Sequence, residues 1–271
     1  MKRILGIFVL VLFTGSVFAQ NISQSNVPAV VLNAFQINYP GAEDAKWKLE
    51  KGNYRVDYRV NSKIHNLTMD NKGQMLKHSQ DLYASEIPKA VLETIRSKEA
   101  YFDLHDADRF EEGYKIVYEI NFKKDGKEHY FWINEKGELL KYRKELKDSE
   151  IPLLLLNHII TQYGSFDIDR AKYVEEFGTV IYIIRGEIND YDHLFVMDQN
   201  ATVIKHNQDL RDSEIPGPVL KAVSTAYEGY DIRDADLTEE GGKVIYILRL
   251  KKSKENVYVT LSQNGKILEV K

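Results

Sequence analysis

Two hydrophobic periods alternate along the chain. After a recurring proline, apolar residues recur every three or four positions, as at Ile87, Val91 and Ile95, and this spacing predicts an amphipathic helix. The period then changes to two, because Ile116, Tyr118, Ile120 and Phe122 alternate with Lys115, Val117, Glu119 and Asn121, and this alternation predicts a strand. Further strands are expected at residues 129–133 and 138–143, with a shorter one around 45–47.

The same order of elements recurs at a fixed spacing along the chain. Ser-Glu-Ile-Pro stands at 85–88, 149–152 and 213–216, and Val27-Pro28 begins an earlier copy. A fixed period of this size indicates one supersecondary unit used several times. Serine can cap a helix, glutamate suits its positive end and proline suits its first turn, so we interpret the tetrapeptide as a helix start rather than a site.

The predicted fold class is therefore α+β, with tandem repeats that each pack one helix on a three- to four-stranded antiparallel β-meander. Units of about 60 residues bury a limited core alone, so we expect neighbouring repeats to pack together, as two pairs. The predicted boundaries are 1–19 for a signal peptide and 20–84, 85–148, 149–212 and 213–271 for the four repeats.

The start of the chain, 1–19, predicts a secretory signal peptide. Lys2 and Arg3 precede an apolar run at 4–13, and Val17-Phe18-Ala19 presents small residues to a signal peptidase. The run is shorter than the roughly 20 residues that span a bilayer, and no transmembrane segment is expected in the mature chain. We therefore expect an exported protein, periplasmic or secreted after cleavage near Ala19-Gln20.

Charge and composition narrow the function classes. Loss of Lys2 and Arg3 moves the formal net charge from −4 to −6, which argues against nucleic acid as a partner. The chain has no cysteine, which removes thiol catalysis and thiolate metal sites. It also lacks G-x-S-x-G, H-E-x-x-H, phosphate-loop and EF-hand motifs, and we interpret the Asp106/Asp108 and Asp167/Asp169 pairs as loop residues. We expect no enzyme and no cofactor.

Histidines recur at two positions of the repeat. His65, His129 and His193 share one position, and His78 and His206 share another. A two-residue turn would place His65 opposite His78, and such imidazole pairs bind metals or respond to pH. The Asp-x-x-Gly turns instead favour a three-residue loop with a bulged glycine, which moves the paired histidines to opposite faces. We favour a half-buried structural position; the alternative is a metal or small-ligand site on His65, His78, His193 and His206.

Apolar residues occupy both faces of the predicted strands, although one helix covers only one face of a sheet. If Phe131 and Ile133 face the helix, Tyr130 and Trp132 face away from it. This second face either buries a contact between repeats or binds a partner through aromatic and arginine anchors. The candidate partner-binding residues are Tyr130, Trp132, Ile181, Ile183, Arg185, Ile245, Ile247, Arg249 and Tyr258.

The first repeat begins with a recognisable set of residues: Val27-Pro28, Val31, Ala34-Phe35, Tyr39-Pro40, Ala42 and Trp47. This set resembles the start of the PepSY-like, β-lactamase-inhibitor-protein-like family of exported bacterial proteins. The later repeats keep the proline, the helix and the turn but lose the Tyr-Pro pair. The resemblance implies a helix on a four-stranded antiparallel sheet, often in tandem, with protein-binding inhibitors among the members and no catalytic residues.

These patterns together predict a non-enzymatic exported binding module for a protein or peptide partner in the cell envelope, an inhibitor being one form of such a module. The alternative is a small-ligand or metal-binding periplasmic protein that uses the repeated histidine positions.

Overall fold

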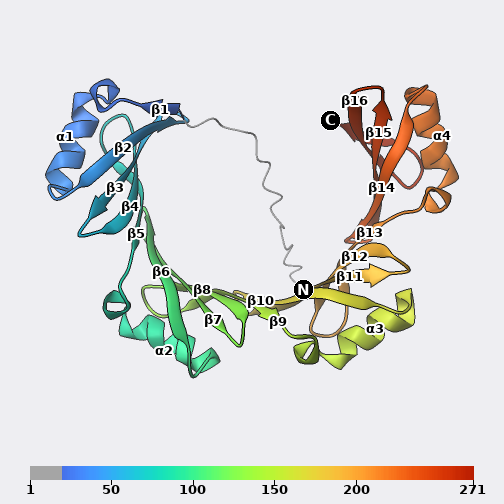
Figure 1. Ribbon diagram of the computed structural model, residues 1–271, viewed down its shortest axis with the longest axis horizontal. Helices are drawn as coiled ribbons and strands as arrows, with labels where there is room; N and C mark the ends of the chain where they lie inside the picture. Colours follow the sequence, from blue (N-terminus) through green and yellow to red (C-terminus); the bar gives the residue numbers. More distant parts are fainter. Residues whose placement is uncertain (1–19) are drawn as a thin grey trace, which may run out of the picture. The chain divides into compact units, whose positions relative to one another are not determined.

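The computed structural model of the protein describes residues 20–271 (Figure 1). The described residues form two compact units. The predicted signal peptide at 1–19 lies outside them. Within residues 20–271, no helix combines the length and apolarity needed to cross a membrane. Unit 1 holds residues 20–93, 106–120 and 134–137, and unit 2 holds 94–105, 121–133 and 138–271.

Unit 1 packs helix α1 on one face of an antiparallel sheet, as Figure 1 shows in blue and cyan. Its strands pair in the order of the sequence, from β1 with β2 through to β5 with β6. Helix α2 (Lys89–Lys98) and strands β6 (Asp103–Glu112) and β7 (Lys115–Lys124) are divided between the two units. The other elements are β1 (Gln20–Ile22), α1 (Ala29–Asn38), β2 (Glu43–Glu50), β3 (Asn53–Val60), β4 (Lys63–Met69) and β5 (Met75–Asp81).

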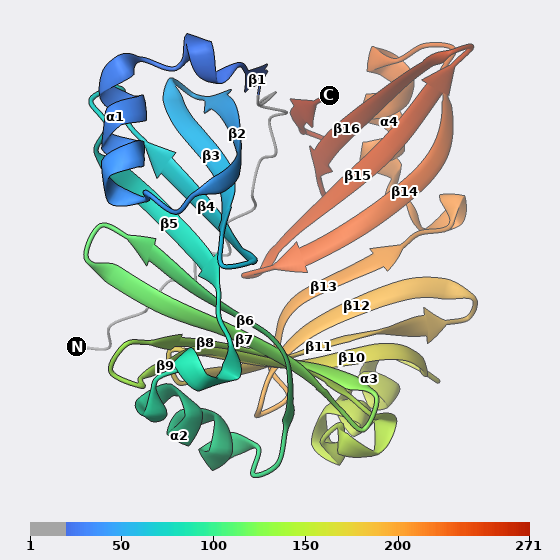
Figure 2. The ribbon, with the colours of Figure 1, turned by 60° about the vertical axis from the view of Figure 1, so that its left-hand side comes forward.

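Unit 2 continues the same alternation of helices and antiparallel strands (Figure 2). Each strand from β8 to β17 pairs with the next, so β9 joins β10 and β13 joins β14 across the predicted repeat boundaries. An antiparallel sheet with helices confirms the predicted α+β class. The elements are β8 (Lys127–Asn134), β9 (Leu139–Leu146), α3 (Leu153–Tyr163), β10 (Asp167–Glu176), β11 (Thr179–Ile188), β12 (Tyr191–Asp198), β13 (Val203–Asp209), α4 (Gly217–Ala226), β14 (Asp231–Glu240), β15 (Lys243–Lys252), β16 (Glu255–Ser262) and β17 (Ile267–Val270).

Each helix buries one apolar stripe against the strands that follow it, and we call this side of the sheet the inner face. In unit 1, Val31 and Phe35 of α1 contact a cluster that contains Trp47 and Tyr58. Equivalent clusters in unit 2 surround α3 and α4. Phe35 is 4% exposed, and full burial of such a side chain contributes about 2 kcal/mol. The opposite side is the outer face.

The Ser-Glu-Ile-Pro tetrapeptide starts helices by a different capping contact from the one predicted. Its serine lies inside a short 3-10 turn, as in Ala84–Glu86, too early to cap the α-helix that begins at Lys89. The glutamate makes the contact instead, because its carboxylate accepts a hydrogen bond from the backbone N–H three residues earlier. The oxygen–nitrogen distances are 2.7 Å for Glu86 to Tyr83, 2.7 Å for Glu150 to Lys147 and 2.8 Å for Glu214 to Arg211.

The hairpin between β4 and β5 explains why the predicted histidine register is wrong. Gly73 has φ +80° and its N–H donates to the Asp70 carbonyl, so the bulged-glycine turn forms as expected. A second irregularity follows, because Met69 pairs with Met75 whereas Thr68 pairs with Lys77. The extra residue restores the two-residue parity of the strands. Both histidines therefore lie on the inner face, and the same bulge recurs between β12 and β13.

Candidate functional site on the outer sheet face

Two aromatic rings and a guanidinium lie together on the outer face of β8 and β9. Tyr130 and Trp132 alternate with buried inner-face residues, and their ring centroids are 6.1 Å apart. The Arg143 guanidinium lies 4.2 Å from the Tyr130 centroid and 5.7 Å from the Trp132 centroid. Lys141 lies 5.8 Å from the same tryptophan ring. We call Tyr130, Trp132, Lys141 and Arg143 the aromatic cluster; its geometry fits cation–π contacts.

Aliphatic side chains continue this surface across the next strands. Arg143 faces Val174 of β10, and Val174 faces Ile181 of β11. One row further, Ile183 faces Val196 of β12. Val174 is 6% exposed, whereas the two isoleucines and Val196 are half-buried. Because Ile181, Ile183 and Val196 keep contact with solvent, the outer face is not closed by a packed layer over these three side chains. We call Val174, Ile181, Ile183 and Val196 the aliphatic strip.

The predicted isoleucines of β15 lie on a separate part of the outer face. Ile245 faces Thr238 and Ile247 faces Asp236, both of β14. Strands β13 and β14 separate them from the aliphatic strip and carry mainly polar outer-face side chains. The predicted candidate residues therefore form two surfaces rather than one.

Two arginines predicted as anchors are already held in ion pairs. Arg185 contacts the Asp192 carboxylate at 2.6 Å, and Arg249 contacts the Asp234 carboxylate at 2.5 Å. Tyr258 lies opposite Arg249 and is 48% exposed. The sequence-based prediction missed Arg143, although period-two alternation places it on the same face as Trp132 once its neighbour Tyr142 points inward.

Three strand pairs that cross the predicted repeat boundaries share one ion-pair position. The pairs are β5–β6, β9–β10 and β13–β14. At each junction a lysine and a glutamate face each other on the outer side at 3.0–3.3 Å: Lys77 with Glu112, Lys141 with Glu176, and Lys205 with Glu240.

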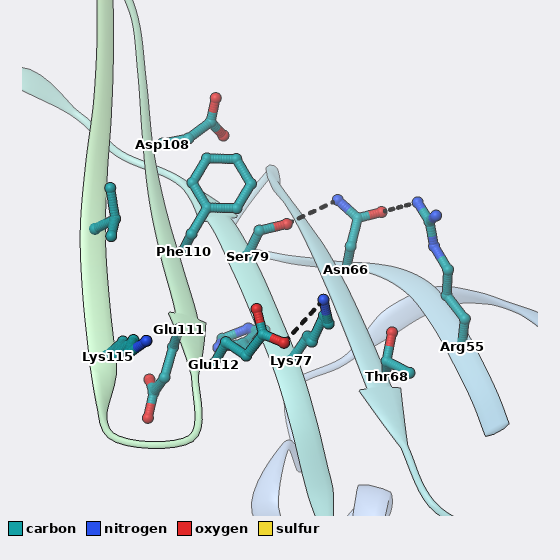
Figure 3. Close-up of a pocket in the computed structure, with 12 residues that line it drawn as sticks. Arg55, Asn66, Thr68, Lys77, Ser79, Asp108, Phe110, Glu111, Glu112 and Lys115 are labelled. Carbon is teal, nitrogen blue, oxygen red and sulfur yellow. Dashed lines mark hydrogen bonds and ion pairs between the residues drawn. The ribbon is translucent and has the colours of Figure 1, made fainter. Parts of the chain in front are cut away.

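The β5–β6 junction carries a hollow where the β9–β10 junction carries the aromatic cluster. Asn66, Thr68 and Ser79 hold the same repeat positions as Tyr130, Trp132 and Arg143. Their small side chains leave a hollow of about 630 Å³, which Phe110 and Asp108 also line (Figure 3). The Asn66 amide bridges the gap by accepting a hydrogen bond from Arg55 at 3.1 Å and donating one to Ser79 at 3.3 Å. The β13–β14 junction has a similar hollow of about 260 Å³.

Two aspartates face each other beside each hollow. Asp81 pairs with Asp108, and Asp209 pairs with Asp236, whereas the middle junction places Glu145 opposite Lys172. The interpretation of Asp108 as a loop residue is wrong, because it lies within β6, and Asp106, Asp167 and Asp169 also lie within strands.

Burial and opposed carboxylates raise the pKa of one aspartate in each pair. Burial and the charges of Asp106, Asp81 and Glu119 raise the pKa of Asp108 to about 7. The Asp81 carboxylate accepts a hydrogen bond from the Ile64 N–H at 3.1 Å.

The second pair behaves in the same way. Burial, a hydrogen bond with Asp209 and the charges of Asp209 and Asp234 raise the pKa of Asp236 to about 6. Each hollow is therefore bordered by one aspartate whose pKa is raised well above its usual value.

The candidate histidines form two buried pairs on the inner face. His65 Nδ1 lies 3.2 Å from His78 Nε2, and His193 Nδ1 lies 3.0 Å from His206 Nε2. Burial, followed by the charge of the neighbouring histidine, lowers the pKa of His78 and of His206 to about 4. In each pair one ring nitrogen lone pair accepts a hydrogen bond and is not free for a metal. Among residues 20–271 no group of three or more His, Cys, Asp or Glu side chains is arranged to hold a metal ion.

The predicted second repeat, 85–148, has a carboxylate network in place of the histidine pair. Tyr142 stands where the other repeats have His78 and His206, and it lies 3.0 Å from His129 Nδ1. Its hydroxyl donates to Glu99, a buried residue that also contacts Lys124 at 2.6 Å. Burial raises the pKa of Glu99, but the hydrogen bonds from Lys124 and Tyr142 outweigh it and hold the pKa below its usual value. The network is therefore satisfied internally.

Comparison with known proteins finds similarity only among solved structures. No family model matches the chain, and no curated protein matches it. A DUF2874 family protein from Bacteroides uniformis is 18% identical with a TM-score of 0.38, covering 43% of this chain and 88% of its own.

Two further structures give similar values. A DUF2874 family protein from Bacteroides ovatus is 21% identical with a TM-score of 0.37, covering 43% of this chain and 86% of its own. A BLIP-like protein from Bacteroides fragilis is 19% identical with a TM-score of 0.37, covering 43% and 85%. Because these TM-scores lie below 0.5, the functional argument rests on the geometry of the chain itself.

Proposed function

We propose that this protein is an exported, non-enzymatic binding module for a protein or peptide partner of the cell envelope. The observation that carries the proposal is the aromatic cluster with the adjoining aliphatic strip. Aromatic and arginine side chains dominate the energetics of protein-binding faces, and a contiguous, partly exposed apolar surface is typical of an interaction site. Neither the cluster nor the strip is needed to cover a helix, because the helices pack on the inner face.

Two further parts of the proposal are the repeat architecture and the export of the protein. We infer four tandem repeats at 20–84, 85–148, 149–212 and 213–271, each a helix on a meander in the manner of PepSY-like domains. The apolar run after Lys2 and Arg3 supports export with cleavage near Ala19-Gln20. Strand pairing between repeats uses their edges, which leaves the outer face for a partner.

Partner capture with matched variants tests the proposal. The mature chain is immobilised and exposed to envelope extract of the producing cell, beside a Trp132→Ala/Ile183→Ser variant of the outer face. The control is Leu153→Ser on α3, a side chain that is 74% exposed on the other side of the sheet. We expect a protein that is retained by the parent and the control but at least about tenfold less by the outer-face variant. Equal retention by all three, or retention of nothing, contradicts the proposal.

A further inference from the structure

Arg143 differs in its partners from four other outer-face cations of unit 2. Lys141, Arg185, Lys205 and Arg249 each contact a carboxylate at 3.3 Å or less. The Arg143 guanidinium contacts only aromatic faces among the described residues, and it is half-buried. Its N–H donors are therefore held in place by the rings, and no carboxylate within residues 20–271 accepts from them.

An arginine held in this way is well placed to bind a carboxylate. A guanidinium presents donors in a fixed planar fork that matches a carboxylate through two parallel hydrogen bonds. Stacking on Tyr130 fixes the plane of the fork, so less conformational freedom is lost when a ligand binds. Trp132 and Val174 flank the group with apolar surface, which strengthens a charged hydrogen bond by excluding water.

We propose that the outer face of unit 2 binds a peptide segment that places an acidic side chain on Arg143 and an apolar side chain on the aliphatic strip. This inference rests on the proposed function and specifies the chemistry of its partner. Arg143 and Ile181 are two strands apart, which is about 10 Å at the usual strand spacing. An extended segment covers that distance in about three residues, so the acidic and apolar residues are expected about three positions apart.

Selection from a display library of random dodecapeptides tests the partner chemistry. The mature chain, Arg143→Gln, Arg143→Lys and the control Arg96→Gln are used in parallel; Arg96 is an exposed arginine of α2. We expect the parent and the control to enrich peptides that contain Asp or Glu with an apolar residue about three positions away. Arg143→Gln is expected to bind these peptides at least about tenfold more weakly, with Arg143→Lys between the two.

The experiments distinguish a failure of the acidic-partner inference from a failure of the proposed function. Enrichment of peptides without acidic residues, or equal binding by parent and Arg143→Gln, overturns the acidic partner and leaves the binding face intact. Replacement of the selected Asp or Glu by its amide must also lose affinity for the parent, and an unchanged affinity overturns the contact with Arg143. Absence of any enriched peptide, together with no retained envelope protein, overturns the proposed function itself.

Discussion

The β5–β6 and β9–β10 junctions use the same outer-face positions in opposite ways. At β5–β6, small polar side chains and an Asp81–Asp108 pair border a hollow. At β9–β10, two aromatic rings stack with Arg143, and the carboxyl pair is replaced by Glu145 opposite Lys172. The strand pairing and the Lys–Glu ion pair are common to both. The ladder therefore sets where side chains lie, and substitutions on it set whether a junction is a hollow or an apolar surface.

The inner face changes together with the outer face. The predicted first and third repeats, which lead into the hollows, carry a histidine pair, and the predicted second repeat carries Tyr142 with Glu99. Glu99 stands where the other repeats have tyrosine, and Lys124 stands where Val60 and Ile188 lie. A buried carboxylate is tolerated only with a partner, so the two substitutions compensate each other.

The largest expected effect is a loss of folding stability at acidic pH caused by a buried histidine pair, which the predicted second repeat does not have. The folded protein resists protonation of His206 until about pH 4, whereas the unfolded chain binds the proton near 6.5. Stability is therefore expected to fall by about 2 kcal/mol as the pH drops from 6.5 to 4. His206→Phe should reduce this slope, measured by urea unfolding across the range. His105→Gln, a change of an exposed histidine, is the control, and an equal slope in His206→Phe contradicts the assignment.

The next largest effect concerns Asp108 beside the hollow at β5–β6. Here folding stability is expected to fall as the pH rises, which is the opposite of the histidine effect. Asp108 keeps its proton in the folded chain up to about pH 7, whereas the unfolded chain releases it near 3.8. Stability is thus lost as the pH rises from about 4 to 7. Asp108→Asn mimics the protonated form and should raise the free energy of unfolding at pH 8 by about 1–2 kcal/mol, an amount reduced by partial exposure. Unfolding followed by fluorescence of the buried Trp47 measures it, and no gain over the exposed control Asp103→Asn contradicts it.

A smaller effect on stability is expected when the β9–β10 junction is given a carboxyl pair like those at β5–β6 and β13–β14. Lys172→Asp places two carboxylates opposite each other, as at β5–β6, without the Ile64 N–H that stabilises Asp81. We expect a loss of about 1 kcal/mol at pH 8 that is recovered near pH 5, when the new pair shares a proton. Thermal unfolding at the two pH values measures this. A loss that is independent of pH would show that Lys172 acts by packing rather than by charge.

The smallest effect on stability is expected at Arg143. This guanidinium has no carboxylate partner among the described residues, so Arg143→Gln should change the free energy of unfolding by less than about 0.5 kcal/mol. Circular dichroism melts of the variant and of Arg96→Gln measure the difference. A loss several times larger than this would assign Arg143 to folding instead of to partner binding.

The alternation of hydrophobic positions was sufficient to predict the antiparallel strands and the helices. It also placed Tyr130 and Trp132 on the face opposite Phe131, because side-chain parity follows directly from the period of two. The bulge after the Asp70–Gly73 turn could not be predicted, since one extra residue in a strand leaves no compositional signal. That bulge alone decided whether His65 meets His78.

Contacts between strands from different repeats were equally inaccessible to the sequence. The pairing of Asp81 with Asp108 depends on which edges join and in what register, and neither is encoded in local periodicity. Arg143 was missed for a related reason, because its significance comes from lying over a ring on the neighbouring strand. Residues that act alone on one strand were therefore easier to identify than residues that act across two.

Methyl NMR spectroscopy of isoleucine-labelled protein tests the central claim most directly. The mature chain is titrated with a captured partner or an enriched peptide while the Ile181 and Ile183 signals are followed. Ile64, which is 46% exposed beside Asp81, reports on the β5–β6 hollow, and Ile160, 50% exposed on α3, reports on the helix side. We expect saturable shifts at Ile181 and Ile183, with the Ile64 and Ile160 signals unchanged. Shifts concentrated at Ile64 or Ile160 would contradict it.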